Sequence, residues 1–404
     1  MSLLQAMHRK SATRWARRAE AAVDIKDLEI LMKKRVPPVV REYFRGAADG
    51  EVTLRDNEEA FQRARFNPRY AVKVDKVDLS TEILGQKINL PVIGGPVGSK
   101  SLLWPEGEKE SSWAAGEVGT IFTLSTLSGT RLEKVKAASS GPGWYQLYLV
   151  GGRNTALRSI EAARSAGYSA LVLTIDTPVA GNRVGHARMK PMDAFAGTLW
   201  QKARFLPQMV KHVSWVKSFY AGGGTMDFPN VVLDDGTCMQ YADIASQLKQ
   251  SGVTWDDISW IRSAWGDLPI VIKGIHNLAD AKLAEQHGAQ AIVISNHGGR
   301  QLDRVWPTLC LLQEIAPQLQ GSSMDILLDG GIRSGADVAI AIASGAKAVL
   351  IGRAQAYGLG AAGGPGVKRA FEIIQKEFDD TLRQLGCRSV HELGPEYLKP
   401  HPFS

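Results

Sequence analysis

The sequence predicts a (β/α)8 barrel that is preceded by helices and interrupted by one long insertion. Three observations predict this fold: eight short apolar runs lie between residues 90 and 351, a Gly-, Ser- or Asp-bearing turn follows each run, and amphipathic segments separate the runs. Near-continuous apolar strands that alternate with helices are typical of a parallel sheet covered by helices. Eight such units fit a barrel better than a doubly wound open sheet, which is the alternative.

The predicted elements follow one another in a regular order. Residues 24–45 read as two helices, and Pro37 and Pro38 open the second, because proline is tolerated in the first turn of a helix. A last helix, Val367–Leu385, closes the barrel before a polar tail. Helices between the strands are predicted at Asn154–Ala166, Leu278–His287, Pro307–Leu319 and Gly335–Ser344. The predicted strands are Leu90–Gly94, Thr120–Leu124, Trp144–Leu149, Ala170–Ile175, Pro269–Lys273, Ala291–Ser295, Asp325–Leu328 and Ala348–Ile351.

The spacing between the strands has one exception. Residues 176–268 separate the fourth strand from the fifth, although a barrel needs only one helix there. Residues 184–230 are therefore predicted to be an insertion in the loop after the fourth strand. The predicted organisation is a basic leader, residues 1–23, and one barrel domain, residues 24–404, which carries this insertion.

The composition is that of an ordinary globular chain and excludes several classes of protein. Of 404 residues, 44% are hydrophobic and 22% are charged, which excludes an intrinsically disordered chain. Three scattered cysteines, Cys238, Cys310 and Cys387, lack metal-ligand spacing, so we expect free thiols in a reducing compartment and no metal site. No run of roughly 18 apolar residues exists, so no segment is expected to span a bilayer.

The net charge of +7 is unevenly distributed. Residues 1–19 hold five basic side chains and no acidic one, and residues 184–220 hold six basic side chains and one acidic one. The rest of the chain has 37 basic and 40 acidic side chains, a balance of −3. Because the body of the protein is not basic, we expect no nucleic-acid partner. The Arg-rich leader suits a solvated segment, with an organellar transit peptide as the alternative.

Polar residues or glycines follow all eight predicted strands. In a barrel the active site lies at the C-terminal ends of the strands, so these residues are expected to share one rim. A lone Ser or Thr there is usually a helix cap and Asp-Gly-Gly is usually a turn, but these readings do not explain a rim that gathers Arg, His, Asp and Lys. The loops after the seventh and eighth strands carry glycines with Arg333 and Arg353, which favours a phosphorylated ligand.

Five segments at the strand ends are SNHGGRQLD (295–303), LTIDTP (173–178), YQLYL (145–149), VIKG (271–274) and LDGGIRSG (328–335). Together they resemble the FMN-dependent L-2-hydroxy acid dehydrogenase and oxidase family, whose members include glycolate oxidase, L-lactate dehydrogenase and mandelate dehydrogenase. The resemblance extends from about Asp24 to about Leu398, and its His-Gly-Gly-Arg motif is highly specific. It implies a barrel with FMN at its C-terminal face, oxidation of an (S)-2-hydroxy acid to a 2-oxo acid, and a homo-tetramer.

The resemblance also implies roles for the charged residues of the rim. His297 matches the catalytic base, and Asp176 matches the carboxylate that orients the imidazole and stabilises its protonated form. Arg183 and Arg300 match the two guanidiniums that bind the substrate carboxylate, a task suited to bidentate pairing. Lys273 matches the cation beside the flavin N1 and C2 carbonyl, where reduction deposits negative charge.

Further rim residues match positions that contact the substrate or FMN. Tyr43 and Tyr148 match phenols that hydrogen-bond the substrate, although Tyr43 also suits simple packing of its helix and Ser125 suits a helix cap. Besides Lys273, contacts with FMN are implied for Pro96, Val97, Gly98, Ser125, Gln146, Thr174, Ser295, Asp329, Gly331, Arg333, Gly352 and Arg353.

Two departures from oxidases of the family bear on substrate and acceptor. Leu127 and Ala180 stand where glycolate oxidase has a tryptophan and a leucine, which predicts a wider pocket and a hydroxy acid larger than glycolate, with an aryl or longer alkyl side chain. Gly98 stands where several oxidases have alanine, as in mandelate and lactate dehydrogenases. We therefore expect poor reactivity with O2 and transfer of electrons to a membrane quinone or similar acceptor; the alternative is a soluble oxidase that uses O2 and releases H2O2.

The insertion predicts a membrane contact. Residues 197–220 place apolar side chains at helical spacing, with Trp200, Phe205, Trp215 and Phe219 interleaved with Lys and Arg. This favours an interfacial segment on an anionic bilayer over a helix that only packs on the barrel. Pro207 argues against one long helix. Mandelate and lactate dehydrogenases are similar in carrying a membrane-associating insertion here, which implies a peripheral protein on the cytoplasmic side of the inner membrane.

Two other functions fit parts of the pattern. An enzyme similar to inosine-monophosphate dehydrogenase would need a catalytic Cys on a rim loop, and Cys310 lies in a predicted helix instead. A binding module on an inactive barrel would not need the complete set of His, Arg and Lys on the rim.

Overall fold

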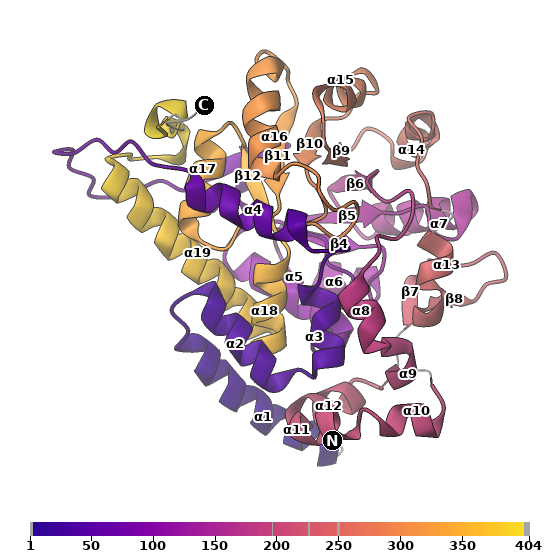
Figure 1. Ribbon diagram of the computed structural model, residues 1–404. Helices are drawn as coiled ribbons and strands as arrows, with labels where there is room; N and C mark the ends of the chain where they lie inside the picture. Colours follow the sequence, from indigo (N-terminus) through magenta and orange to yellow (C-terminus); the bar gives the residue numbers. More distant parts are fainter. Residues whose placement is uncertain (1–2, 196, 225–226, 249–250, 400–404) are drawn as a thin grey trace.

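The computed structural model describes residues 3–195, 197–224, 227–248 and 251–399, and its centre is a closed barrel of eight parallel strands (Figure 1). Each predicted strand is present, with ends that differ by at most two residues, so the barrel is confirmed and the open sheet is excluded. Around the barrel the strands are β3 (Val92–Gly94), β4 (Phe122–Ser125), β5 (Gly143–Leu147), β6 (Ala170–Thr174), β9 (Ile270–Ile275), β10 (Ala291–Ile294), β11 (Asp325–Asp329) and β12 (Ala348–Ile351).

The interior of the barrel is filled with apolar side chains, including Ile93, Trp144 and Val293. A short hairpin of β1 (Thr81–Ile83) and β2 (Gln86–Ile88) packs its isoleucines into this cluster. The Trp144 indole N–H donates to Gln86 Oε1 of this hairpin at 3.3 Å. Because the hairpin covers the N-terminal end, the opposite end of the barrel is the one left for a site.

Helices cover the outside of the barrel because each has one apolar face to bury. Their starts follow local sequence signals: α17, for example, begins at a capping box in which Ser334 Oγ accepts from the Asp337 N–H and the Asp337 carboxylate accepts from the Ser334 N–H. The covering helices are α5 (Gly107–Glu117), α6 (Leu132–Ala137), α7 (Gly152–Ser165), α14 (Asp257–Trp265), α15 (Leu278–Gln286), α16 (Thr308–Ile315), α17 (Gly335–Ala343), α18 (Arg353–Ala362) and α19 (Gly364–Leu385); short 3-10 turns are η1 (Lys100–Leu102), η3 (Ala316–Leu319), η4 (Val390–Glu392) and η5 (Pro395–Tyr397).

Four helices precede the barrel: α1 (Leu3–Glu20), α2 (Ile25–Arg35), α3 (Pro38–Arg45) and α4 (Val52–Arg63). The predicted pair within residues 24–45 is confirmed as α2 and α3. The solvated leader expected for residues 1–23 is wrong over its described part, because α1 packs against α18, α19 and the insertion and buries Trp15 and Ala19. Apolar burial on one side of α1 outweighs the charge on its other side.

The insertion is a chain of short elements between β6 and α14. Pro207 lies in the first turn of α11, and the expected interruption of the helix there is confirmed. The intervening elements continue past residue 230, so they extend beyond the predicted range 184–230. They are α8 (Val184–Met189), α9 (Pro191–Phe195), α10 (Leu199–Ala203), α11 (Leu206–Lys211), α12 (Val213–Ala221), β7 (Asp227–Val232), β8 (Cys238–Gln240), η2 (Tyr241–Asp243) and α13 (Ile244–Leu248).

Within the described ranges, no helix combines the length and the apolar character that crossing a bilayer requires.

Candidate active site

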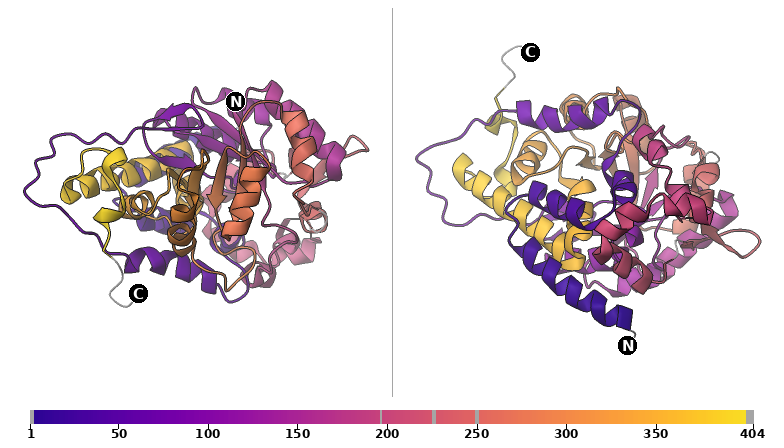
Figure 2. Two further views of the ribbon diagram at one scale, coloured as in Figure 1. Left: turned by 90° about the horizontal axis from the view of Figure 1, so that it is seen from above. Right: turned by 60° about the horizontal axis from the view of Figure 1, so that its bottom comes forward.

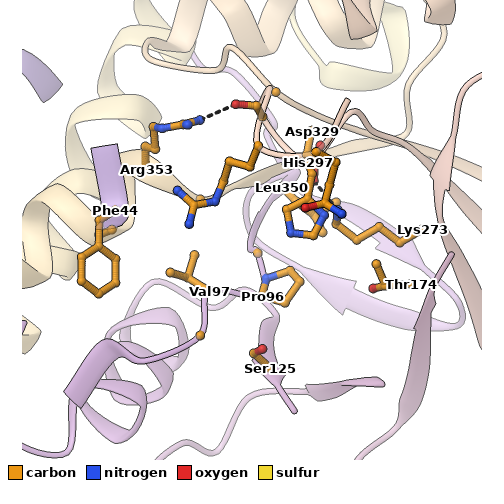
Figure 3. A pocket seen from close by; sticks show the side chains of 18 of the residues that line it. Phe44, Pro96, Val97, Ser125, Thr174, Lys273, His297, Asp329, Leu350 and Arg353 are labelled. Atoms are coloured by element: carbon orange, nitrogen blue, oxygen red, sulfur yellow. Dashed lines mark hydrogen bonds and ion pairs between the residues drawn. The ribbon is translucent and has the colours of Figure 1, made fainter. Parts of the chain in front are cut away.

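A pocket lies at the C-terminal end of the barrel, where residues from the ends of all eight strands line it. Figure 3 shows Lys273 beside His297 and Asp329, with Thr174, Ser125, Pro96, Val97 and Arg353 around the same pocket. The residues that follow the eight predicted strands therefore do lie together at one end of the barrel, as expected. Lining residues from the predicted set are Tyr43, Pro96, Val97, Gly98, Ser125, Tyr148, Thr174, Arg183, Lys273, His297, Arg300, Asp329, Gly331, Arg333, Gly352 and Arg353.

Three predicted residues, Asp176, Gln146 and Ser295, lie one step behind the lining. Asp176 contacts His297, Gln146 Oε1 accepts from Ser125 Oγ at 3.0 Å, and Ser295 Oγ accepts from Lys273 Nζ at 2.7 Å. Each therefore holds a side chain that does line the pocket.

His297 is fixed by its backbone and by its two ring nitrogens. Its φ of 56° is left-handed, which is uncommon for a residue with a side chain and is found at functional sites. Nδ1 lies 3.0 Å from Asp176 Oδ1, and Nε2 lies 3.3 Å from the Tyr148 hydroxyl. The next residue, Gly298, is also left-handed, and a Cβ there would lie 2.6 Å from Arg353 Nη1. A side chain at position 298 would thus displace an arginine of the pocket.

The charges of the His297–Asp176 pair follow from burial and from Lys273. Burial lowers the pKa of His297 below its ordinary value, and the Asp176 charge opposes this only in part. Burial also raises the pKa of Asp176, but the interaction with His297, which donates a hydrogen bond to it, and the charge of Lys273 outweigh this effect, so the carboxyl pKa lies below its usual range. An ionised Asp176 can only accept a hydrogen bond, so Nδ1 carries the proton and the Nε2 lone pair faces the pocket.

Two guanidiniums meet over the ring of Tyr43. The Cζ atoms of Arg300 and Arg183 lie 5.3 and 5.8 Å from the centre of that ring. Burial, and then the charges of Arg183 and Arg353, lower the pKa of Arg300 well below its ordinary value, and Arg183 Nε is buried without a partner among the described residues. Because like charges crowd here, an anionic ligand would relieve the repulsion.

Lys273 is a buried cation with close anionic neighbours. Its Nζ lies 3.1 Å from Asp329 Oδ2 and donates to Ser295 Oγ. Burial lowers the pKa of Lys273, but the carboxylates of Asp329 and Asp176 raise it more, so the ammonium group stays charged.

Several buried polar atoms lie unpaired where FMN is expected. Gln146 Nε2, Thr174 Oγ1 and Asp329 Oδ1 have no hydrogen-bond partner within the part of the chain that the structure describes. Buried polar atoms are nearly always paired, so these three mark a place for a ligand that donates and accepts hydrogen bonds. One amide donor, one hydroxyl and one carboxylate acceptor fit the polar edge and hydroxylated chain of a flavin nucleotide.

The phosphate end of the expected site contains Arg353 and Arg333. Arg353 donates to the backbone oxygens of Arg45, Gly298 and Gly46 at 2.8–3.0 Å, and burial lowers its pKa to about 10. Arg333 Nη2 lies 2.9 Å from Glu58 Oε1 on α4. The position of Glu58 here was not predicted, because residues 58 and 333 are far apart in the sequence.

An apolar wall of the pocket was also missed. Ile244 and Leu248 of α13 line the pocket together with Phe44 and Leu127. They belong to a cluster with side chains of the β7–β8 hairpin, against which Ala180 packs. The short apolar run 244–248 carried no signal that distinguishes a pocket wall from an ordinary core helix.

Comparisons with known proteins agree with this geometry. The model of the FMN-dependent dehydrogenase family matches residues 32–400. The chain is 36% identical to glycolate oxidase of Spinacia oleracea over 93% of its own length and 95% of the relative's. It is 37% identical to L-lactate dehydrogenase of Serratia proteamaculans (strain 568), over 92% and 97% of the two lengths.

A solved structure of the monotopic membrane protein (S)-mandelate dehydrogenase superposes with a TM-score of 0.86 at 32% identity, covering 94% of this chain and 99% of that one. The unpaired polar atoms and the buried cations of the pocket fit the cofactor of the matched family, FMN. The chain belongs to the FMN-dependent dehydrogenase family.

Proposed function

We propose that this enzyme oxidises (S)-2-hydroxy acids to 2-oxo acids. The observation that carries the proposal is the neutral His297, held by Asp176, beside the paired guanidiniums of Arg183 and Arg300. The imidazole can accept a proton and the two guanidiniums can bind a carboxylate, and oxidation of a 2-hydroxy acid requires both functions. When bound, FMN supplies a two-electron acceptor.

The roles of the residues follow from their places in the pocket. Arg183 and Arg300 bind the substrate carboxylate and so orient the α-carbon. His297 Nε2 takes a proton from the substrate, either from the α-carbon or from the hydroxyl, and Asp176 stabilises the imidazolium that forms. Tyr148, whose pKa is raised by burial and by Asp176, stays protonated and donates a hydrogen bond. Tyr43 contributes the second phenol.

The residues that would hold FMN divide into two groups. Lys273 supplies positive charge where reduction adds negative charge, and it is kept charged by Asp329. Ser125, Thr174 and the backbone of Pro96, Val97 and Gly98 line the pocket and would contact the ring and the sugar-alcohol chain, with the unpaired Gln146 Nε2 reaching the same ligand from behind the lining. Ser295 would act through Lys273, whose ammonium group donates to its hydroxyl. Asp329, Gly331, Arg333, Gly352 and Arg353 would contact the chain and the phosphate.

A dye-linked assay tests the proposed reaction. The protein is supplied with each enantiomer of a 2-hydroxy acid, and the 2-oxo acid and the reduced dye are measured. We expect equal amounts of both products from the (S) form and none from the (R) form. Oxidation of both enantiomers at similar rates would contradict the proposal.

The substrate is proposed to be larger than glycolate, with an aryl or longer alkyl side chain. Supporting this, Leu127, Ile244 and Leu248 form an apolar wall, and solved structures similar to this chain include mandelate oxidase with (S)-mandelic acid. The values of kcat/KM for glycolate, L-lactate, (S)-mandelate and 2-hydroxyoctanoate decide this point. Faster turnover of glycolate than of the larger acids would contradict it.

The electron acceptor is proposed to be a membrane quinone or similar compound rather than O2. Gly98 lines the pocket, and a Cβ there would lie 3.0 Å from Leu127 Cβ, so this corner is packed around glycine. Rapid mixing of the reduced enzyme with air tests the proposal, since fast reoxidation would favour the oxidase alternative.

We also propose that the insertion makes a peripheral membrane contact on the cytoplasmic side of the inner membrane. Its exposed apolar side chains and the monotopic (S)-mandelate dehydrogenase structure support this. Unchanged co-sedimentation with liposomes after deletion of residues 190–225 would contradict it.

The homo-tetramer implied by the resemblance stays a prediction, which sedimentation velocity tests.

A further inference from the structure

The two basic segments of the chain lie side by side in space. Helix α1 packs along α12 of the insertion, although more than 190 residues separate them in the sequence (Figure 2). In Figure 1, α10, α11 and α12 and the N-terminus share the same end of the molecule. The rest of the chain has a charge of −3, so the basic helix α1 lies beside the part of the insertion that carries Lys202, Arg204, Lys211 and Lys217. This raises the local positive potential well above what either segment supplies alone.

Helix α1 has one buried side and one charged side. Trp15 and Ala19 are buried against the body, whereas Arg14, Arg17 and Arg18 are exposed. The guanidinium of Arg18 lies over the Trp15 ring at 4.9 Å. The exposed arginines therefore sit on a helix with a fixed orientation rather than on a free tail.

Helix α12 is equally well anchored. Its Trp215 is 3% exposed and donates its indole N–H to the Leu102 carbonyl at 2.7 Å. Arg35 of α2 donates to Ser218 Oγ at 2.7 Å, which ties the insertion to the helices before the barrel. This side of α12 therefore packs on the helices before the barrel and on η1.

The neighbouring helices expose large apolar side chains in the same region. Leu199 and Trp200 of α10 are 83% and 85% exposed, and Leu206 and Val210 of α11 are 60% and 63% exposed. Exposed apolar groups gathered on an anchored, basic support are costly in water unless another surface covers them.

We propose that α1 and the insertion helices α10–α12 together form one docking face for an anionic lipid bilayer, with α1 supplying a second row of positive charge. This rests on the proposed membrane contact of the insertion and extends it to the N-terminal helix. Arginines attract lipid phosphates, and the apolar side chains of α10 and α11 enter the interface. Nucleic acid fits less well, because most of the exposed apolar side chains of α10 and α11, Leu199, Leu206 and Val210, are aliphatic and cannot stack on bases, although Trp200 could.

The test measures binding of the holoenzyme to phosphatidylglycerol–phosphatidylcholine vesicles by co-sedimentation, with pure phosphatidylcholine vesicles for comparison. The variant Arg14→Gln with Arg17→Gln removes two exposed charges from α1 and keeps Arg18 on Trp15. We expect its affinity for the anionic vesicles to fall about ten- to thirtyfold, since each basic residue near such a surface contributes about fivefold. Turnover with a soluble dye should stay unchanged.

Two matched variants complete the design. Lys73→Gln with Lys76→Gln removes two exposed charges from the loop before the barrel, outside α1 and the insertion, and should leave binding unchanged. Leu199→Ser with Trp200→Ser removes the apolar tip of the insertion and should weaken binding to both kinds of vesicle.

The outcomes separate the two proposals. If the α1 variant binds like the parent while the Leu199–Trp200 variant does not, the role of α1 is wrong and the membrane contact of the insertion stands. If neither variant loses binding, both proposals are wrong. If the α1 and the loop variants lose binding equally, only net charge matters and the docking face is wrong. If soluble RNA displaces the enzyme from the vesicles and binds it more tightly at the same salt concentration, the assignment to lipid is wrong.

Discussion

Asp176 Oδ1 lies 3.0 Å from His297 Nδ1, and this contact joins the end of β6 to the left-handed turn after β10. The carboxylate fixes the tautomer of the imidazole, and the low pKa of His297 keeps Nε2 free to accept a proton. Burial keeps the imidazole neutral, and the charge of Asp176 stabilises the imidazolium that forms when Nε2 accepts a proton. The pair is therefore arranged as a base.

Replacing His297 with Ala should abolish turnover and leave FMN bound. The cofactor contacts lie mainly on other residues, whereas general-base catalysis contributes about 10²–10⁴-fold. Flavin absorbance after gel filtration and kcat with a dye acceptor check both parts. Loss of FMN from the variant would show that His297 holds the cofactor instead.

The pH dependence of kcat/KM should report the His297 base. Since the neutral imidazole is the active form, activity is lost as the pH falls through its pKa, which lies below the ordinary value. Asp176 raises the pKa of His297, so Asp176→Asn should move this acid limb to lower pH and lower the plateau. An acid limb that moves to higher pH in the Asn variant would contradict the assigned charges.

Replacing Arg300 with Lys should raise KM for the hydroxy acid about ten- to hundredfold, the effect of losing one charged hydrogen bond. The chemical step should change less, because His297 is untouched. Steady-state kinetics separate the two parameters. An unchanged KM with a much lower kcat would mean that Arg300 acts on the reacting atoms and not on the carboxylate.

Glu58 should weaken FMN binding, because its carboxylate competes with the phosphate for Arg333, at 2.9 Å in the structure. Glu58→Gln is expected to lower the Kd for FMN about two- to tenfold, as for a partly exposed ion pair, with no effect on riboflavin, which lacks the phosphate. Fluorescence quenching of added flavin measures both. The matched control is Glu59→Gln on the same helix, where Glu59 pairs with Arg63. Weaker FMN binding in Glu58→Gln would mean that Glu58 orients Arg333 for the phosphate.

Leu248→Ala should lower kcat/KM for (S)-mandelate about ten- to hundredfold, as expected when an apolar contact with the substrate is removed. The value for L-lactate should change little, since a methyl group does not reach this wall. Leu233→Ala serves as control, because Leu233 packs against the same cluster without lining the pocket. Equal losses for both acids would place Leu248 outside the contact with the side chain.

The barrel was predictable because its signals are local. Each strand is a short apolar run before a Gly-, Ser- or Asp-bearing turn, and Pro38 in the first turn of α3 fixes where that helix begins. The polar rim was predictable because strand ends converge at one edge of a barrel. The resemblance added the roles, which the residue types alone leave open.

Other features depend on contacts between distant residues. Arg333 donates a hydrogen bond to Glu58, 275 residues earlier in the sequence, and no motif near either residue predicts this pair. The apolar wall from α13 depends on how the insertion folds back over the pocket. The burial of α1 did have a signal, since Ala12, Trp15 and Ala19 recur at helical spacing, but the surrounding arginines favoured a solvated segment.

The most direct test of the central claim is anaerobic rapid mixing of the oxidised holoenzyme with (S)- and (R)-mandelate, followed by flavin absorbance. The account predicts fast bleaching by the (S) form, none by the (R) form, and none by either form in the His297→Ala variant. Bleaching of the His297→Ala variant at the parent rate would contradict the role of the His297–Asp176 pair. A flavin that no 2-hydroxy acid bleaches would contradict the proposed reaction itself.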